Sequence, residues 1–129
     1  MMKLMTAAAM VAGMTTAAWA ADPAVGTWKT QVDDDRYAHV KMVPCGSAIC
    51  GTIVKTFLKG EDYQSPNLGK TLVIDMKPKG GGAYAGKVWR PSNDKIYIGK
   101  MSVSGNSLKL SGCVAGGLIC SKQTWERLK

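Results

Sequence analysis

Short runs in which apolar and polar residues alternate occupy most of the chain after residue 20. In one run Leu72, Ile74 and Met76 fall on one face, and in another Tyr97 and Met101 do. A period of two is typical of a half-buried β-strand, whose successive side chains point to opposite faces. The runs that fit this pattern are residues 25–30, 37–43, 51–57, 71–76, 83–90, 95–103, 107–112 and 121–128. We therefore predict eight short strands.

Turn-forming residues lie between nearly all of these runs. Examples are Asp33-Asp34-Asp35, Gly80-Gly81-Gly82 and Gly105-Asn106. Strands joined in this way form an up-and-down antiparallel meander, which removes its exposed edges most easily by closing into a barrel. Residues 61–68 include Pro66 and lack a strand pattern, so they are expected to form a longer loop.

The predicted fold class is all-β, a small antiparallel up-and-down barrel of about eight strands. Gly86, Gly99 and Gly112 fall inside predicted strands, where glycine permits sharp coiling. A barrel of eight strands either holds one small ligand or is filled by its own side chains.

The first twenty residues resemble an export signal rather than part of the fold. Met1-Met2-Lys3 is a short basic start, an Ala-rich apolar run follows, and Ala18-Trp19-Ala20 has small residues at both positions that signal peptidase requires to be small. The apolar run is shorter than the roughly 20 residues needed to span a bilayer. We predict a cleaved signal peptide at 1–20, a single domain at 21–129, and a periplasmic or secreted protein with no membrane-spanning segment after cleavage.

The four cysteines, Cys45, Cys50, Cys113 and Cys120, agree with export. An even number of cysteines in an exported chain favours disulfides, for which three pairings are possible. Cys45–Cys50 and Cys113–Cys120 are favoured, because residues that face each other at the neck of a hairpin lie within disulfide range. The alternative is a four-cysteine zinc site. The six residues between Cys113 and Cys120 exceed the two to four that usually separate such ligands.

Candidate catalytic chemistry is sparse. The single histidine, His39, is expected to be a surface or hydrogen-bonded residue. No phosphate-binding loop, nucleophile elbow, Cys-x-x-Cys or histidine-rich metal motif occurs in the sequence. We expect no cofactor, no metal and no catalytic residue.

The chain is basic, with a formal net charge of +8. Its Lys and Arg residues are dispersed, and export makes nucleic acid an unexpected partner despite the charge. Anionic lipid or another envelope polyanion is the partner that this charge favours, and the alternative is that the charge serves solubility alone. The candidate patch is Lys77, Lys79, Lys87 and Arg90, around the Gly80–Gly82 turn.

A first resemblance rests on residues of the first and last predicted strands. Gly26-Thr27-Trp28 opens the first strand and Arg127 lies in the last, so a guanidinium can rest on an indole in a cation–π contact. This pair resembles the signature of lipocalin-like (calycin) barrels. That resemblance implies that Gly26, Trp28 and Arg127 are structural and close one end of the barrel.

A second resemblance covers nearly all of residues 21–129. The motifs that carry it are Gly26-Thr27-Trp28-Lys29-Thr30, Cys45-Gly46, Cys50-Gly51-Thr52-Ile53-Val54, Tyr97-Ile98-Gly99-Lys100-Met101, Gly112-Cys113-Val114, Gly116-Gly117-Leu118-Ile119-Cys120 and Gln123-Thr124-Trp125. In this order they resemble the exported bacterial family known as domain of unknown function 2147. The resemblance implies a small periplasmic or secreted lipocalin-like barrel without an established activity. Residues 61–68 depart from the family, which usually has a longer segment here.

Three hypotheses for function remain open. The first is a non-enzymatic protein that binds a small apolar or amphipathic ligand inside the barrel. Its expected lining is Met42, Ile74, Tyr97, Met101 and Leu110, for each of which ordinary core packing is the rival. The second is an envelope interaction module with a filled barrel, which binds anionic lipid or a protein through its basic surface. The third is an enzyme whose site at the barrel mouth no motif reveals.

Overall fold

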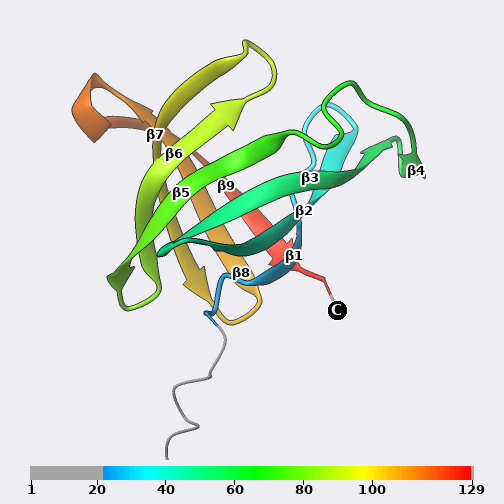
Figure 1. Cartoon of the computed structure of the whole chain (residues 1–129). Coiled ribbons are helices and arrows are strands. Elements are labelled where there is room, and N and C mark those ends of the chain that lie inside the picture. The colour runs from blue at the N-terminus through cyan, green and yellow to red at the C-terminus, as the bar shows by residue number, and fades with distance from the viewer. Residues whose placement is uncertain (1–21, 129) are drawn as a thin grey trace, which may run out of the picture.

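The computed structural model describes residues 22–128, so the predicted signal peptide lies outside the described residues. The elements are β1 (Gly26–Lys29), β2 (Arg36–Cys45), β3 (Ala48–Leu58), β4 (Glu61–Asp62), β5 (Thr71–Gly80), β6 (Ala83–Arg90), β7 (Lys95–Ser104), β8 (Ser107–Val114), the 3-10 turn η2 (Ala115–Gly117) and β9 (Ile119–Arg127) (Figure 1). All eight predicted strands are confirmed. The two-residue β4 falls in the expected loop and has no apolar alternation that could reveal it.

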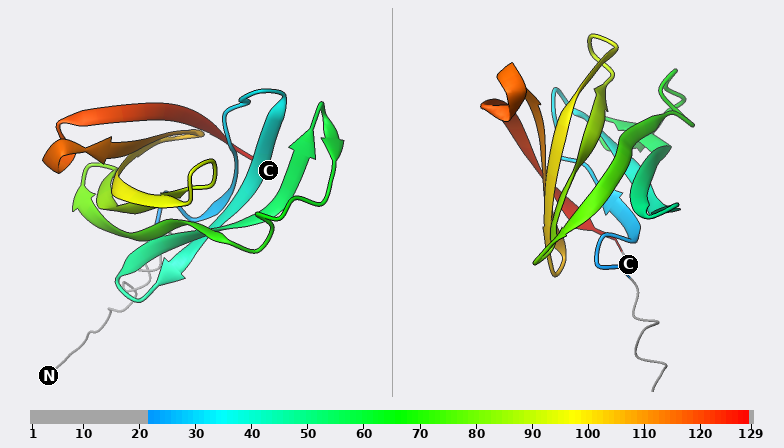
Figure 2. Two further views of the ribbon diagram at one scale, coloured as in Figure 1. Left: turned by 90° about the horizontal axis from the view of Figure 1, so that it is seen from above. Right: turned by 60° about the vertical axis from the view of Figure 1, so that its left-hand side comes forward.

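The strands close into a barrel. Their order is β2-β1-β9-β8-β7-β6-β5-β3, and β2 also pairs with β3, which joins the two ends of the sheet. Every strand pairing is antiparallel. Viewed end-on, the strands form a ring from which the β3–β4 hairpin projects (Figure 2, left). No helix among residues 22–128 is long and apolar enough to cross a membrane.

One end of the barrel is closed by an aromatic plug. Trp28 is fully buried and donates a hydrogen bond from Nε1 to Ala24 O at 2.9 Å. The Arg127 guanidinium lies 4.3 Å from the centre of the Trp28 ring, and its Nη1 donates to Val25 O at 2.9 Å. A Cβ at Gly26 would lie 2.9 Å from Arg127 Nη1, so a larger residue would displace the guanidinium. These contacts hold Arg127 against Trp28 at this end of the barrel.

The loops after β1, β3, β6 and β8 lie at the other end of the barrel, uppermost in Figure 1. The loop after β1 covers residues 30–35 and ends in a two-residue turn, in which Asp34 and Asp35 have φ of 53° and 60°. Asp33 and Arg36 exchange both backbone hydrogen bonds across it. Two central residues with positive φ are typical of the tight hairpin turn that matches strand twist. The predicted turn is therefore confirmed.

Both local disulfides are present. Cys113 and Cys120 face each other directly across β8 and β9, with Cα atoms 4.1 Å apart. Cys45 instead faces Ala48, because the β2–β3 turn contains only Gly46 and Ser47. The Cys45–Cys50 bridge is consequently diagonal, with a Cα–Cα distance of 5.8 Å. The pairing is as predicted, although the expected direct apposition is wrong for this pair.

Candidate functional site

A cavity of about 910 Å³ occupies the barrel interior and opens among the upper loops. Small-molecule pockets commonly measure roughly 300–1,000 Å³. The cavity therefore has room for one small molecule.

The cavity has an apolar wall and a polar rim. The wall comes from inward-facing positions of the barrel strands and includes Ile53, Leu72, Val88, Leu110 and Trp125. The rim comes from the loops and from the strand ends next to them, and includes Arg36, Asn67, Arg90, Ser92 and Lys122. Trp125 is almost fully buried, and its Nε1 donates to Gln123 Oε1 at 2.8 Å. That bond leaves the amide NH2 of Gln123 as a donor at the cavity wall.

Two basic residues lie near Tyr97 at the mouth of the cavity. Asn93 Nδ2 donates to the Tyr97 hydroxyl oxygen at 2.7 Å. This hydrogen bond, together with Arg90 and Lys95 nearby, holds the pKa of Tyr97 below its ordinary value of 10. Charged and polar atoms thus gather at the opening, whereas the apolar side chains lie deeper in the barrel.

The expected ligand-lining residues fall into three places. Tyr97 and Leu110 line the cavity. Met42 and Met101 are buried in the hydrophobic core and do not line it. Ile74 faces outward, where it borders a separate outer groove of about 470 Å³.

The outward position of Ile74 corrects the sequence interpretation, and the reason is irregularity in β5. The pairing of β5 with β3 and β6 shifts register near Leu72 and again between Ile74 and Lys77. Asp75 has a φ of 47° at the second shift. A bulge inserts one extra residue, so the period-two assignment inverts beyond it. Val73 and Met76 are consequently buried, while Ile74 points outward opposite Lys87.

Several lining residues were not anticipated from sequence. Val88 and Trp125 could have been found by extending the alternation along their strands, because Val88 follows Tyr84 and Gly86 and Trp125 follows Gln123. Thr56 carries no such signal. Its hydroxyl donates to Tyr63 O and accepts from Ser65 N at 3.4 Å, which ties the segment after β4 to the wall of the cavity.

Comparison with known proteins identifies the chain at the level of family. The model of a bacterial family described as "Uncharacterized protein conserved in bacteria (DUF2147)" matches residues 26–127. The chain belongs to this family. No curated protein matches it.

A solved structure similar to this DUF2147 protein is HP1028 from the human pathogen Helicobacter pylori, described as belonging to the lipocalin family. The two superpose with a TM-score of 0.65 at 17% sequence identity, and the match covers 81% of this chain and 82% of that one. At this identity the similarity shows the fold alone. The lipocalin-like barrel expected from the sequence is confirmed.

The single histidine of the DUF2147 chain lies on the outer face of β2. His39 pairs with Lys29 on β1 and Lys55 on β3, and its ring centre lies 4.6 Å from that of Phe57. Partial burial lowers the pKa of His39 below 6.5, and the neighbouring charges of Lys55 and Lys29 lower it further. His39 is not part of the cavity lining.

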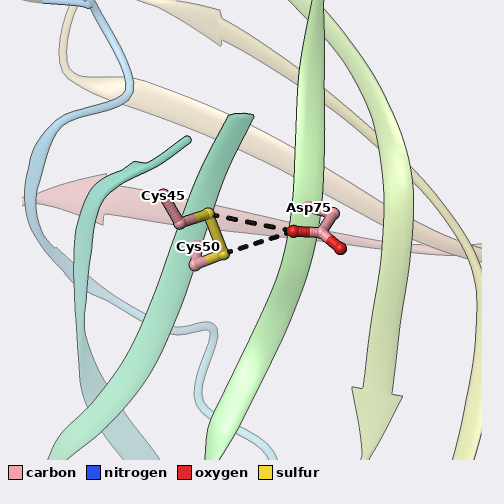
Figure 3. Close-up of a disulfide and its surroundings, with 3 residues drawn as sticks. All are labelled: Cys45, Cys50 and Asp75. Atoms are coloured by element: carbon pink, nitrogen blue, oxygen red, sulfur yellow. Dashed lines mark hydrogen bonds between the residues drawn. A yellow bond between two sulfur atoms is a disulfide. The ribbon is translucent and has the colours of Figure 1, made fainter. Parts of the chain in front are cut away.

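Within residues 22–128, one group of side chains has the proximity of a metal site: Cys45, Cys50 and Asp75. Asp75 Oδ1 lies 4.0 Å from Cys45 Sγ and 3.8 Å from Cys50 Sγ (Figure 3). Both sulfurs belong to the disulfide and carry no proton, so neither can act as a thiolate ligand or donate to the carboxylate while the bridge is intact. In the oxidised protein the contact places a negative charge beside a disulfide.

The basic residues expected to cluster around the Gly80–Gly82 turn do not all gather there. Lys77 and Lys79 lie on β5 as it approaches the turn. Arg90 ends β6, seven residues beyond Ala83 and therefore about 23 Å along the strand, and it lines the cavity mouth. The predicted four-residue patch is therefore wrong in the placement of Arg90.

Proposed function

We propose that this protein is an exported, non-enzymatic binding protein that holds one small amphipathic molecule in its barrel. The observation that carries the proposal is the 910 Å³ cavity, which is apolar at depth and polar at its opening. An amphipathic molecule matches this gradient, because its apolar part is removed from water against the wall while its polar part stays hydrated at the rim.

Three features support the separate parts of this proposal. The plug formed by Trp28 and Arg127 closes the barrel at the end opposite the opening, so a ligand enters and leaves through one mouth. Two disulfides are typical of oxidising compartments outside the cytoplasm. Binding is favoured over catalysis because His39, the residue best suited to acid–base chemistry at neutral pH, lies outside the cavity.

The test uses 1-anilinonaphthalene-8-sulfonate, an amphipathic probe whose emission rises in apolar surroundings. We expect saturable binding of one probe per chain, accompanied by a change in Trp125 emission. The Gly112→Leu variant places a side chain in the cavity, because a Cβ at Gly112 would lie 3.5 Å from Val88 and 3.6 Å from Tyr97, both lining residues. This variant should weaken probe binding about tenfold or more, by filling the volume that the probe occupies.

Lys109→Leu is the matched control, because it adds the same side chain to the exposed face of the same strand. It should leave the affinity for the probe unchanged. Native mass spectrometry of protein purified from its host then identifies what occupies the cavity. Absence of saturable probe binding in the folded wild type, or equal loss in both variants, would overturn the proposal.

A further inference from the structure

The outer face of the barrel carries a row of lysines that the strand register creates. Lys77 on β5 pairs with Ala85, Ala85 pairs with Lys100 on β7, Lys100 pairs with Ser111, and Ser111 pairs with Lys122 on β9. The three lysines are exposed and occupy alternate strands in one row of paired residues across the sheet. Adjacent strands lie about 4.8 Å apart, so consecutive lysines of the row are about 9.6 Å apart at the backbone.

The rows above and below add positive charge to this face. Lys87 lies in the row Ile74–Lys87–Ile98–Cys113–Cys120, and Lys109 lies in the row Ala83–Ser102–Lys109–Thr124. The positions of the three rows include five lysines and no acidic residue. We call Lys77, Lys87, Lys100, Lys109 and Lys122 the basic face. The two salt bridges of the described chain involve other residues, Arg36–Asp34 and Lys55–Asp62.

Exposed aliphatic side chains border the basic face on the side of the cavity mouth. Ile96 is 60% exposed and Leu118 86%, and Ile98 is also exposed. We call these three residues the apolar ridge. Contiguous exposed apolar side chains are uncommon on soluble monomers and mark interaction sites.

A direct contact joins the ridge to the basic face. Lys100 Nζ donates to Gly117 O at 3.1 Å, so the η2 turn lies against the lysine row. Leu118 is the next residue and is 86% exposed, so it lies close to that row. Figure 1 shows this turn, in orange, at the end of the β8–β9 hairpin.

We infer that the basic face and the apolar ridge form a docking surface for an anionic phospholipid bilayer. Lysines are attracted to the negative surface potential of such a bilayer. Leucine and isoleucine side chains are stabilised by entering the boundary between headgroups and acyl chains. An acidic polysaccharide would satisfy the lysines but offers no apolar layer for Leu118 and Ile98. The inference does not depend on what the cavity holds.

The experiment is co-sedimentation of the mature protein with vesicles of phosphatidylcholine alone or of phosphatidylcholine mixed with phosphatidylglycerol. Binding is expected only to the anionic vesicles. It should weaken as the Debye length falls from about 10 Å at 0.1 M to 3 Å at 1 M salt. The double variant Lys87→Gln/Lys100→Gln should bind about tenfold or more weakly. Lys41→Gln/Lys59→Gln removes two exposed lysines from the opposite side of the barrel and should bind like the wild type.

Leu118→Asp separates a bilayer from a soluble polyanion, and Val43→Asp is its control. Val43 is 38% exposed but lies on β2, away from the ridge. Leu118→Asp should weaken vesicle binding strongly, and Val43→Asp should not. The inference fails if phosphatidylcholine vesicles bind equally well, or if the basic-face variant binds like the wild type. It also fails if dextran sulfate binds through the same lysines while Leu118→Asp leaves the affinity for vesicles unchanged.

Discussion

At the scale of single residues, the Asp75 carboxylate lies beside the Cys45–Cys50 bridge, where a reductant must approach. A reductant attacks as a thiolate, which is an anion. Asp75 Oδ1 is 3.8 Å from Cys50 Sγ, and like charges about 4 Å apart repel by about 1 kcal/mol in water and more near a protein surface. We therefore predict that Asp75→Asn accelerates reduction of this bridge by dithiothreitol roughly fivefold or more.

The second bridge of the same chain is an internal control for that prediction. Within residues 22–128, the polar atom beside Cys120 Sγ is the uncharged carbonyl oxygen of Gly117 rather than a carboxylate. Alkylation of released thiols followed by peptide mapping measures both rates in one experiment. An equal change at the two bridges, or slower reduction of Cys45–Cys50, would contradict the argument.

His39 makes stability depend on pH in a predictable direction. Its pKa in the fold lies below the 6.5 of the unfolded chain, because burial and then Lys55 and Lys29 disfavour the charged ring. Below pH 6.5 the unfolded state therefore binds more protons than the folded state, and stability falls as pH decreases toward the folded pKa. Above pH 6.5 both states are neutral at His39 and this contribution is constant.

Urea denaturation between pH 5 and 7 measures this effect. The wild type is expected to lose stability on acidification through this range, and His39→Gln should show a flatter profile because it cannot be protonated. A variant whose profile matches that of the wild type would show that other groups cause the dependence.

At the scale of elements, the irregularity of β5 depends on a glycine in its neighbour. A Cβ at Gly86 would lie 2.4 Å from Asp75 O and 2.7 Å from Ile74 O, and backbone atoms cannot move aside as a flexible side chain can. We predict that Gly86→Ala lowers the free energy of unfolding by about 1–3 kcal/mol. Gly112→Ala is the comparison, because its nearest neighbour would be a side-chain atom at 3.5 Å, an ordinary contact. Urea titration of both variants should show a loss only for Gly86→Ala.

At the scale of the whole molecule, one sheet separates two surfaces with different chemistry. Its inner side lines the cavity with residues such as Leu110, and its outer side presents Lys87 and Lys100. We predict that Lys87→Gln/Lys100→Gln loses vesicle binding but keeps its affinity for the naphthalene probe, while Gly112→Leu does the reverse. Substitutions at sites without shared partners usually act independently. A single set of variants assayed for both properties tests this, and loss of both properties in either variant would contradict it.

Much of the fold follows from local pattern. Alternation with a period of two locates all eight barrel strands, and the glycine and aspartate turns locate the ends of several of them, because strand and turn preferences act over a few neighbouring residues. The disulfide partners could be inferred because each pair spans a single hairpin. The plug of Trp28 and Arg127 could be inferred because closure of a meander makes its first and last strands neighbours.

The cavity lining and the basic face required the tertiary structure. The register shifts in β5 turn Ile74 outward, and a bulge is set by pairing with neighbouring strands rather than by alternation within one. Met42 and Met101 share the inward parity of Tyr97 and Leu110, and only their depth in the barrel places them in the core instead of at the cavity. The lysine row joins residues up to 45 positions apart, from Lys77 to Lys122, through four successive strand pairings. Sequence thus determined which residues form strands and which face is apolar, while register and closure decided which side chains meet, because these depend on contacts between segments far apart in the chain.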